Sequence, residues 1–543
     1  MKKILTRMIL LSVCSALLLA ALTACGGKTD PDPVLDPTVT SADSNPTAPD
    51  HSEEMIAGDG QVMTVGGEAV FGSTFRADFF SPFYQGSAVN YIWPAMEPLA
   101  YFRAYDQSWR PCLATQWERD SETSLVIHLT DKASWSDGTP FTAADVIATW
   151  DARLAHGTEA VIGSPVGYEA KDNYTVRIEW EKPSQQFEVW ALCQHVYQAK
   201  AIEEHDTDWL NTNLVGTGPY KMVRFVPDQE LVFEKRDDYW GDPVAIDKIT
   251  MKYIQDSVAQ LAAYINGEID SLTVRDNTTA TQLMQEGFEG TDNTTMGTHH
   301  YALIIAKDPD APLTNAAVRR AIYLHGVDWN AYASIVGGSL GFHTDMLGIP
   351  SMSYYKDSLE QTSYDPDKCR QELADAGYPD GFSCNIYARS STTAMATVMQ
   401  ESLKQIGISA EVVLMDDSMS FGKILASDEY MSGIMFGNFT SSAYPQMDRF
   451  IKHMSPDATF GAAAECSDER RNAWNNAFAA VTAEEEDKWL YEYVDCYVHK
   501  EAAIWPTYNT KIINFSQSWY HQSPFSLTVS SGVDPHEIWV SPK

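Results

Sequence analysis

Ser339 is the residue of this sequence that most resembles a hydrolase nucleophile. The run Gly337-Gly338-Ser339-Leu340-Gly341 fits the pattern G-x-S-x-G, and His343 follows shortly after it. Such a serine is activated when a strand, a sharp turn and a helix place it beside a histidine that accepts its proton. Here a helical stretch ends at Val336 and a loop follows, so we interpret the pattern as a chance match.

Few side chains of this sequence have the spacing of metal ligands. His299 and His300 form the only adjacent histidine pair, and neighbours on an extended strand point to opposite faces, which makes them poor joint ligands. We interpret the acidic pairs Asp237-Asp238 and Asp416-Asp417 as solvated turns rather than as the paired carboxylates of a glycosidase. No Cys-x-x-Cys occurs, so a structural zinc site or a redox motif is unsupported. We expect no metal and no cofactor.

The N-terminal segment has the order of a secretion signal. Three basic residues lie within the first seven positions, an apolar run spans 8–21, and Leu22-Thr23-Ala24-Cys25 follows at once. The tetrad resembles a bacterial lipobox, which predicts a signal peptide at 1–24 and lipidation of Cys25. The alternative is a plain signal peptide with an incidental cysteine. Residues 25–60 are rich in Pro, Asp, Ser and Thr, which is typical of a disordered tether.

Composition limits the classes of partner. Acidic residues outnumber basic ones by 74 to 38, and a formal net charge of −36 repels nucleic acid, so we expect no nucleic-acid partner. A chain of 543 residues, 44% of them hydrophobic, is long enough for two or three lobes. The cysteines outside the signal and its lipobox have no deducible pairing, and they are Cys112, Cys193, Cys369, Cys384, Cys466 and Cys496.

Strand and helix patterns mix along the chain without a fixed repeat, which predicts an α/β protein. Alternating apolar residues predict strands at 124–129 and 174–180 that are neighbours in a small sheet. Capping residues and terminal glycines predict helices from Thr142 with Asp145 to Gly157, from Asp256 to Gly267, from Asp365 and Pro366 to Gly377, and from Thr482 with Glu485 towards His499.

Residues 135–146, WSDGTPFTAADV, resemble the signature of the peptide and nickel solute-binding family of ABC importers. This segment reads as a structural corner, with a turn at Asp137-Gly138 and a helix cap at Thr142, and not as a ligand site. Further segments resemble motifs of the family in the family's order, and they lie at 111–117, 216–220, 239–241, 262–270, 318–322, 364–379 and 403–408. Matches in register over nearly the whole body are hard to obtain by chance.

This resemblance implies an α/β fold of the periplasmic-binding-protein type (Venus-flytrap), with two main lobes and an inserted third lobe. The first lobe would comprise 61–92, 214–306 and 502–543, the inserted lobe 93–213, and the second lobe 307–501. Extended crossings near 304–308 and 501–506 would join the main lobes. A solute that contacts both lobes would shift the protein to its closed form.

The family normally recognises the free amine of a peptide through an acid in a pattern like W-x-x-D-Y-P-D-P. The corresponding stretch here is 437–445, GNFTSSAYP, and it has Ala443 where the acid belongs. Because a buried ammonium without a partner is costly, either another carboxylate such as Asp448 serves or the solute has no free amine. The resemblance predicts ligand contacts from Phe79, Phe80, Phe83, Tyr84, Asn438, Phe439, Thr440, Ser442, Tyr444, Asp448 and Trp505, with core packing as the alternative for the aromatic residues.

The function that the resemblance implies is capture without catalysis. We expect a monomeric lipoprotein on the outer face of the cytoplasmic membrane that binds a small solute, with an oligopeptide as the leading class, and delivers it to an ABC permease. Two alternatives stay open: a binding protein for an oligosaccharide or a nickel chelate, and a surface hydrolase or chaperone-like receptor on the same scaffold.

Overall fold

The structure is a computed structural model, and the residues that it describes belong to one compact unit, Glu54–Lys543. They are residues 55–73, 80, 89–103, 105–106, 108–155, 164–184, 186–348, 361–416, 427, 429–442, 455–456, 464–528 and 532–543. The predicted signal peptide, Cys25, most of the predicted tether, Gly157 and Asp417 lie outside these ranges. Among the described residues, no helix is both long and apolar enough to cross a membrane.

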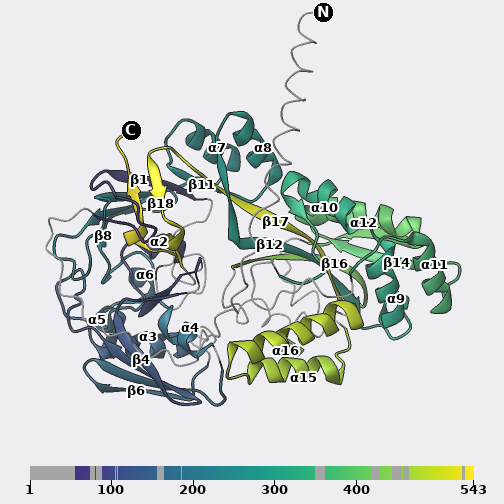
Figure 1. Ribbon diagram of the computed structural model, residues 1–543, viewed down its shortest axis with the longest axis horizontal. Helices are drawn as coiled ribbons and strands as arrows, with labels where there is room; N and C mark the ends of the chain where they lie inside the picture. Colours follow the sequence, from purple (N-terminus) through teal and green to yellow (C-terminus); the bar gives the residue numbers. More distant parts are fainter. Residues whose placement is uncertain are drawn as a thin grey trace, which may run out of the picture. The chain divides into compact units, whose positions relative to one another are not determined.

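One large sheet of eleven strands runs through this unit (Figure 1). Its path is β15-β14-β16-β12-β17-β11-β1-β10-β9-β8, and β13 pairs with β17. The strands are β1 (Glu68–Ser73), β8 (Tyr220–Val226), β9 (Glu230–Lys235), β10 (Lys248–Tyr253), β11 (Ser271–Val274), β12 (Gly290–Ala306), β13 (Gly341–Phe342), β14 (Ser383–Ala388), β15 (Ser409–Leu414), β16 (Ser432–Ser442) and β17 (Ile504–Ser516). Pairs β1·β10, β1·β11, β14·β15 and β14·β16 are parallel, and the other pairs are antiparallel.

Strands β12 and β17 join the first-lobe strands to the second-lobe strands. β17 pairs with β11 through residues 513–516 and with β12 over most of its length, whereas β12 also pairs with β16 from Met296 to Ala306. The two strands contain 17 and 13 residues, and the segments expected as crossings, 304–308 and 501–506, overlap the end of β12 and the start of β17. The lobe boundaries themselves stay predictions, and we keep their names for those residue ranges.

The inserted lobe contains a separate four-stranded sheet in the order β4-β5-β7-β6. Strands β5 and β7 pair antiparallel, which confirms that the segments predicted at 124–129 and 174–180 are neighbours. The elements of this part are β2 (Ala100–Phe102), β3 (Trp109–Pro111), β4 (Ala114–Ser121), β5 (Ser124–Leu129), α3 (Ala143–Ala155), β6 (Gly167–Asp172), β7 (Thr175–Glu179), α4 (Phe187–Leu192), α5 (Ala199–Glu204) and α6 (Thr207–Leu210).

The predicted helix starts are confirmed by their caps. Asp256 accepts a hydrogen bond from the Ala259 amide at 2.8 Å, and Asp365 accepts one from the Lys368 amide at 2.9 Å. These satisfy amides that a helix leaves unpaired in its first turn. The remaining helices are α2 (Val89–Ile92), α7 (Ser257–Ile265), α8 (Asn277–Gln285), α9 (Ala316–Ala321), α10 (Trp329–Gly337), α11 (Pro366–Asp375), α12 (Thr393–Gln405), α15 (Asp468–Phe478) and α16 (Ala483–Asp495).

The 135–146 segment is a structural corner, as predicted. The Asp137 carboxylate accepts hydrogen bonds from the Thr139 amide and hydroxyl at 3.0 and 2.6 Å, and Gly138 has a φ of +83°. The Thr142 amide donates to Asp145 at 2.8 Å where α3 begins. Because Trp135 is buried in the core beneath this turn, the segment stabilises the lobe.

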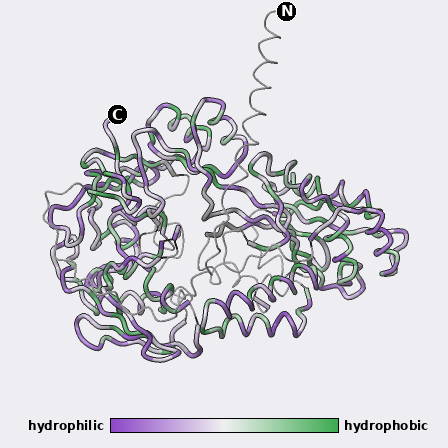
Figure 2. The backbone as a smooth tube through the Cα atoms, viewed as in Figure 1, coloured by the Kyte–Doolittle hydropathy of each residue, from purple (hydrophilic) through white to green (hydrophobic). Residues whose placement is uncertain are grey.

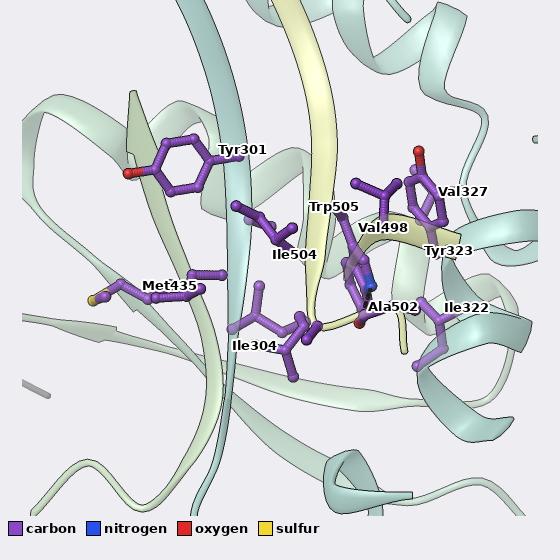
Figure 3. Close-up of a cluster of buried hydrophobic side chains, with 14 of the residues drawn as sticks. Tyr301, Ile304, Ile322, Tyr323, Val327, Met435, Val498, Ala502, Ile504 and Trp505 are labelled. Carbon is purple, nitrogen blue, oxygen red and sulfur yellow. Dashed lines mark hydrogen bonds between the residues drawn. The ribbon is translucent and has the colours of Figure 1, made fainter. Parts of the chain in front are cut away.

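The second lobe shares one hydrophobic core with the adjoining parts of β12 and β17. Figure 3 shows Trp505 close to Ala502, Tyr323 and Val498, with Tyr301 and Met435 on neighbouring strands. In Figure 2, hydrophilic and hydrophobic stretches alternate along α15 and α16, as expected of helices with one buried face.

The C-terminal residues return to the first lobe as short strands: β18 (Tyr520–Gln522) pairs with β21 (Ile538–Val540), and β19 (Leu527–Thr528) pairs with β20 (Gly532–Val533).

Candidate functional site

The carboxyl ends of two parallel strands, β14 and β16, define the candidate site. β14 pairs with β16 only through Ile386 with Ile434 and Tyr387 with Met435, and β14 ends at Ala388. β16 continues to Ser442, paired on its other side with β12. Ligands of open α/β sheets bind beyond the carboxyl ends of parallel strands, so this edge is where a solute is expected.

The edge of β16 beyond Met435 has no strand partner among the described residues. An extended strand with an unpaired edge presents alternating backbone N–H and C=O groups, which is the arrangement that accepts an added strand. Gly437 lies at the start of this edge with the Tyr301 ring against it, and a β-carbon there would lie 2.5 Å from the Tyr301 hydroxyl. Tyr301 therefore packs against β16 at the point where this edge begins.

A row of side chains crosses the three strands beside this edge. Asn438, His300 and Tyr508 are direct cross-strand neighbours, so they share one face of the sheet. The His300 and Tyr508 rings stack with centroids 4.0 Å apart and an interplanar angle of 2°. Asn438 is exposed, which leaves its amide free to contact a solute. The family resemblance predicts Asn438 as a contact, whereas its position beside His300 and Tyr508 follows only from the strand pairing.

His300 is a neutral member of this row. Its Nε2 lies 3.2 Å from the Thr510 hydroxyl, and its Nδ1 is buried with no hydrogen-bond partner in the part of the chain that the structure describes. Burial, with a smaller contribution from the neighbouring His299, lowers the pKa of His300 to about 3. The imidazole is consequently uncharged at neutral pH and offers hydrogen bonding rather than a positive charge.

His299 faces the opposite side of the sheet, as predicted for adjacent strand residues. Asn509 donates through Nδ2 to the Thr344 hydroxyl at 2.7 Å, so its Oδ1 accepts from His299 Nδ1 at 2.6 Å. Burial lowers the pKa of His299 to about 4, which keeps this ring neutral as well. The chain of hydrogen bonds holds β12, β17 and the segment after α10 together, and it has a structural role.

The two histidines do not form a joint metal site. They occupy opposite faces of β12, and within the described ranges no three His, Cys, Asp or Glu side chains gather as a metal site requires. The described cysteines Cys112, Cys193, Cys369, Cys384, Cys466 and Cys496 are all unpaired.

The hydrolase pattern around Ser339 does not assemble a catalytic pair. Ser339 follows helix α10 rather than a strand, and its hydroxyl donates to Asn277 Oδ1 at 2.6 Å. The His343 nitrogens instead lie 3.1 Å from the Thr507 carbonyl and 3.2 Å from Asp345 Oδ1. A nucleophile needs its base within hydrogen-bond reach, and here both groups have other partners.

Two predicted contact residues lie in hydrophobic cores. Phe80 is 1% exposed and packs edge-on against Phe225, with ring centroids 5.1 Å apart. Trp505 is fully buried in the second-lobe core (Figure 3), where its Nε1 donates to the Ala502 carbonyl at 2.9 Å. This burial favours the core-packing alternative for both side chains, and their contact roles stay predictions.

The structure places the other predicted contacts only in part. Phe439, Thr440 and Ser442 lie on β16 opposite His299, Thr298 and Met296, and their side chains are outside the description. Residues of the prediction that lie outside the described ranges are Phe79, Phe83, Tyr84, Tyr444 and Asp448, together with Ala443 at the position of the family's acid. Their contact roles stay predictions.

Comparison with known proteins identifies relatives of this chain. The pattern of the bacterial extracellular solute-binding proteins, family 5 (middle region), matches residues 108–460. Heme-binding protein A of Haemophilus influenzae is 23% identical over 486 residues, covering 80% of this chain and 86% of that protein. Two solved structures share the fold at 18% identity and cover 88% of this chain. NikA from Brucella suis, in complex with Fe(III)-EDTA, matches over its whole length with a TM-score of 0.74, and DppA from Helicobacter pylori, in complex with the peptide STSA, matches over 98% of its length with a TM-score of 0.69.

Proposed function

The chain belongs to the bacterial extracellular solute-binding proteins, family 5, and from this premise we propose that it captures an oligopeptide for an ABC importer. The observation that carries the choice of a peptide is the edge of β16 beyond Met435, which no described strand pairs with. An extended peptide is the solute class whose backbone can pair with such an edge, residue by residue. The neutral row of Asn438, His300 and Tyr508 beside it favours uncharged side chains or backbone groups over a charged one.

Capture works through closure without chemistry. A solute that contacts both main lobes is bound more tightly in the closed form and therefore raises its population, and a permease recognises that form. Because Ser339 has no histidine beside it, incubation of a bound peptide with the protein should leave the peptide intact. If the wild type yields a cleaved product and Ser339→Ala does not, the protein is a hydrolase and the binding-only function is wrong.

The first test is the mode of peptide recognition, with tetra-alanine as the probe. We expect N-methylation of an internal amide to weaken binding at least about tenfold, because it removes a backbone hydrogen bond and places a methyl group against the β16 edge. Acetylation of the terminal amine should change the Kd by less than about threefold, since Ala443 replaces the family's acid. Calorimetric titration of the three peptides measures both effects.

The reverse pattern would contradict this mode. If acetylation abolishes binding while N-methylation is tolerated, the amine is recognised by a carboxylate such as Asp448. Hemin and a nickel–histidine complex serve as competing solutes in the same titrations, since a relative of this chain is a heme-binding protein. If either binds more tightly than the peptides, the peptide assignment is wrong. Mass spectrometry of the solute carried through gentle purification checks the result independently.

We also propose that the protein is held at the outer face of the cytoplasmic membrane by lipid on Cys25. The basic start, the apolar run and the tetrad ending at Cys25 support this. Metabolic labelling with an alkyne fatty acid should mark the wild-type protein and leave Cys25→Ser unlabelled and released from the membrane fraction. Cys466→Ser is the matched control and should keep both label and location, because Cys466 lies in the folded body. Label that persists in Cys25→Ser would contradict the anchor.

A further inference from the structure

The inserted lobe and the second lobe contact each other where the start of α4 meets the first turn of α16. Gln186 Nε2 donates a hydrogen bond to Glu486 Oε1 at 2.9 Å, and both side chains are buried, at 3% and 8% exposure. The Trp190 and Phe478 rings form a second contact between the two lobes, with centroids 6.4 Å apart. Figure 1 shows α4 beside one end of α16.

The α4 side of this contact is rigidly part of the inserted lobe. Phe187 stacks on Trp180 with ring centroids 4.0 Å apart and an angle of 12°. Arg119 of β4 donates two hydrogen bonds to the Glu188 carboxylate, at 2.8 and 2.6 Å. Gln186 therefore moves with the inserted lobe, whereas Glu486 moves with the second lobe.

If the Glu486 carboxylate is ionised, it cannot donate a hydrogen bond to the oxygen of the Gln186 amide. Gln186 Oε1 is buried and has no hydrogen-bond partner among the described residues, although its own amide nitrogen is paired with Glu486. An ionised carboxylate only accepts hydrogen bonds, whereas a protonated one also donates. A proton on Glu486 would allow a reciprocal pair, in which the amide donates to the acid and the acid donates to Gln186 Oε1. Both buried polar groups would then be satisfied.

The charges around Glu486 favour the protonated form. Burial raises the pKa of Glu486 to about 7; the Gln186 hydrogen bond opposes this shift, and the like charge of Asp487 adds to it. On the facing α4 segment the charged group is Glu188, which is tied to Arg119, and α15 contributes the apolar Phe478 ring. Within the described ranges no basic side chain pairs with Glu486.

We propose that the Gln186–Glu486 contact is a proton-dependent latch that holds the inserted lobe and the second lobe together. When the lobes part, Glu486 is returned to water, where a glutamate has a lower pKa, so closing takes up a proton. The contribution of the latch to closure is therefore full below the pKa of the open form and decreases as the pH rises towards about 7. The latch is a property of the scaffold and does not depend on which solute is bound.

The test measures closure in the full chain without any solute. Fluorescent dyes are attached through azide-bearing amino acids at the exposed positions 203 on α5 and 401 on α12, and energy transfer is followed from pH 5.5 to 7.5. In the wild type we expect the ratio of closed to open molecules to fall as the pH rises, by up to about tenfold per pH unit. Glu486→Gln, which keeps a neutral group of the same shape, should hold the acid value across the range.

Two variants keep the result interpretable. Glu484→Gln changes an exposed acid one residue from the helix start and should retain the wild-type pH response. Gln186→Ala should lower the closed fraction at pH 5.5 while circular dichroism shows a folded chain. The proposal is overturned if the wild type shows no pH response, or if Glu486→Gln responds as the wild type does. Because no solute is present, failure of the peptide assignment leaves this result unaffected.

Discussion

Asp534→Ala should lower the free energy of unfolding by about 3–5 kcal/mol, the usual effect of removing one partner of a buried ion pair. Asp534 is fully buried, and its carboxylate lies 3.4 Å from the Arg110 guanidinium on β3. His536 adds a hydrogen bond from its backbone amide at 3.1 Å and a ring contact at 2.9 Å. The substitution leaves the Arg110 charge without its partner at the joint between the inserted lobe and the C-terminal segment.

Urea denaturation followed by tryptophan fluorescence measures this loss. Asp247→Ala is the control, because Asp247 is exposed and its 2.5 Å pair with Lys235 should contribute less than about 1 kcal/mol. Equal losses of unfolding free energy in the two variants would show that the buried ion pair stabilises the protein no more than the exposed one does. Burial alone would raise the pKa of Asp534, but Arg110 and His536 together hold it well below its ordinary value. Its stabilisation is therefore present above about pH 4 and decreases as the pH falls further.

The inserted lobe is held to the C-terminal segment and to the second lobe by different kinds of contact. Towards the C-terminal segment it has two ion pairs with buried acids, Arg110 with Asp534 and Arg103 with Glu537, the latter at 3.0 Å. Towards the second lobe, the described contacts include the hydrogen bond from Gln186 to Glu486, and the Gln186 side chain carries no charge. A neutral bond is broken at lower cost than a buried ion pair, so opening is expected on the second-lobe side.

Local signals explain which parts of the fold could be predicted from sequence. A cap such as Asp365 acts on an amide three residues away, and the alternation in β5 is set by its own two faces, so short segments contain the information. The length of β12 and β17 was not predictable in this way, because their pairing joins residues about 200 positions apart. Register of that kind is decided by the partner strand.

The binding residues were harder to predict for the same reason. Phe80 and Trp505 have the residue types of a binding platform, yet only the packed neighbours Phe225 and Ala502 show that they are covered. His300 was noticed as half of a histidine pair, but its stacking on Tyr508 depends on a strand that follows 200 residues later. Residue type restricts what a side chain can do, and tertiary contact determines which option is used.

The GTGPY motif at 216–220 is a case in which the structure supplies the physical reason for a sequence pattern. The Gly218 amide donates to the Ala95 carbonyl at 2.9 Å, and the Tyr220 amide donates to the Pro94 carbonyl at 3.2 Å. Arg236 in turn donates to the carbonyls of this turn, among them that of Thr217 at 3.3 Å. The motif thus packs directly against the backbone that leads into the inserted lobe.

Gly216→Ala should accordingly destabilise the protein by about 3 kcal/mol or more, at the upper end of the range for overpacking. A β-carbon at Gly216 would lie 1.7 Å from the Ala95 carbonyl oxygen and 2.6 Å from its carbon, and a backbone cannot move aside as a side chain does. Gly138→Ala is the matched control. Gly138 has a φ of +83° but open space around it, so alanine there should cost only about 1–2 kcal/mol of backbone strain. Urea midpoints and expression yield measure both variants, and a Gly216→Ala protein as stable as Gly138→Ala would show that the close approach is not required.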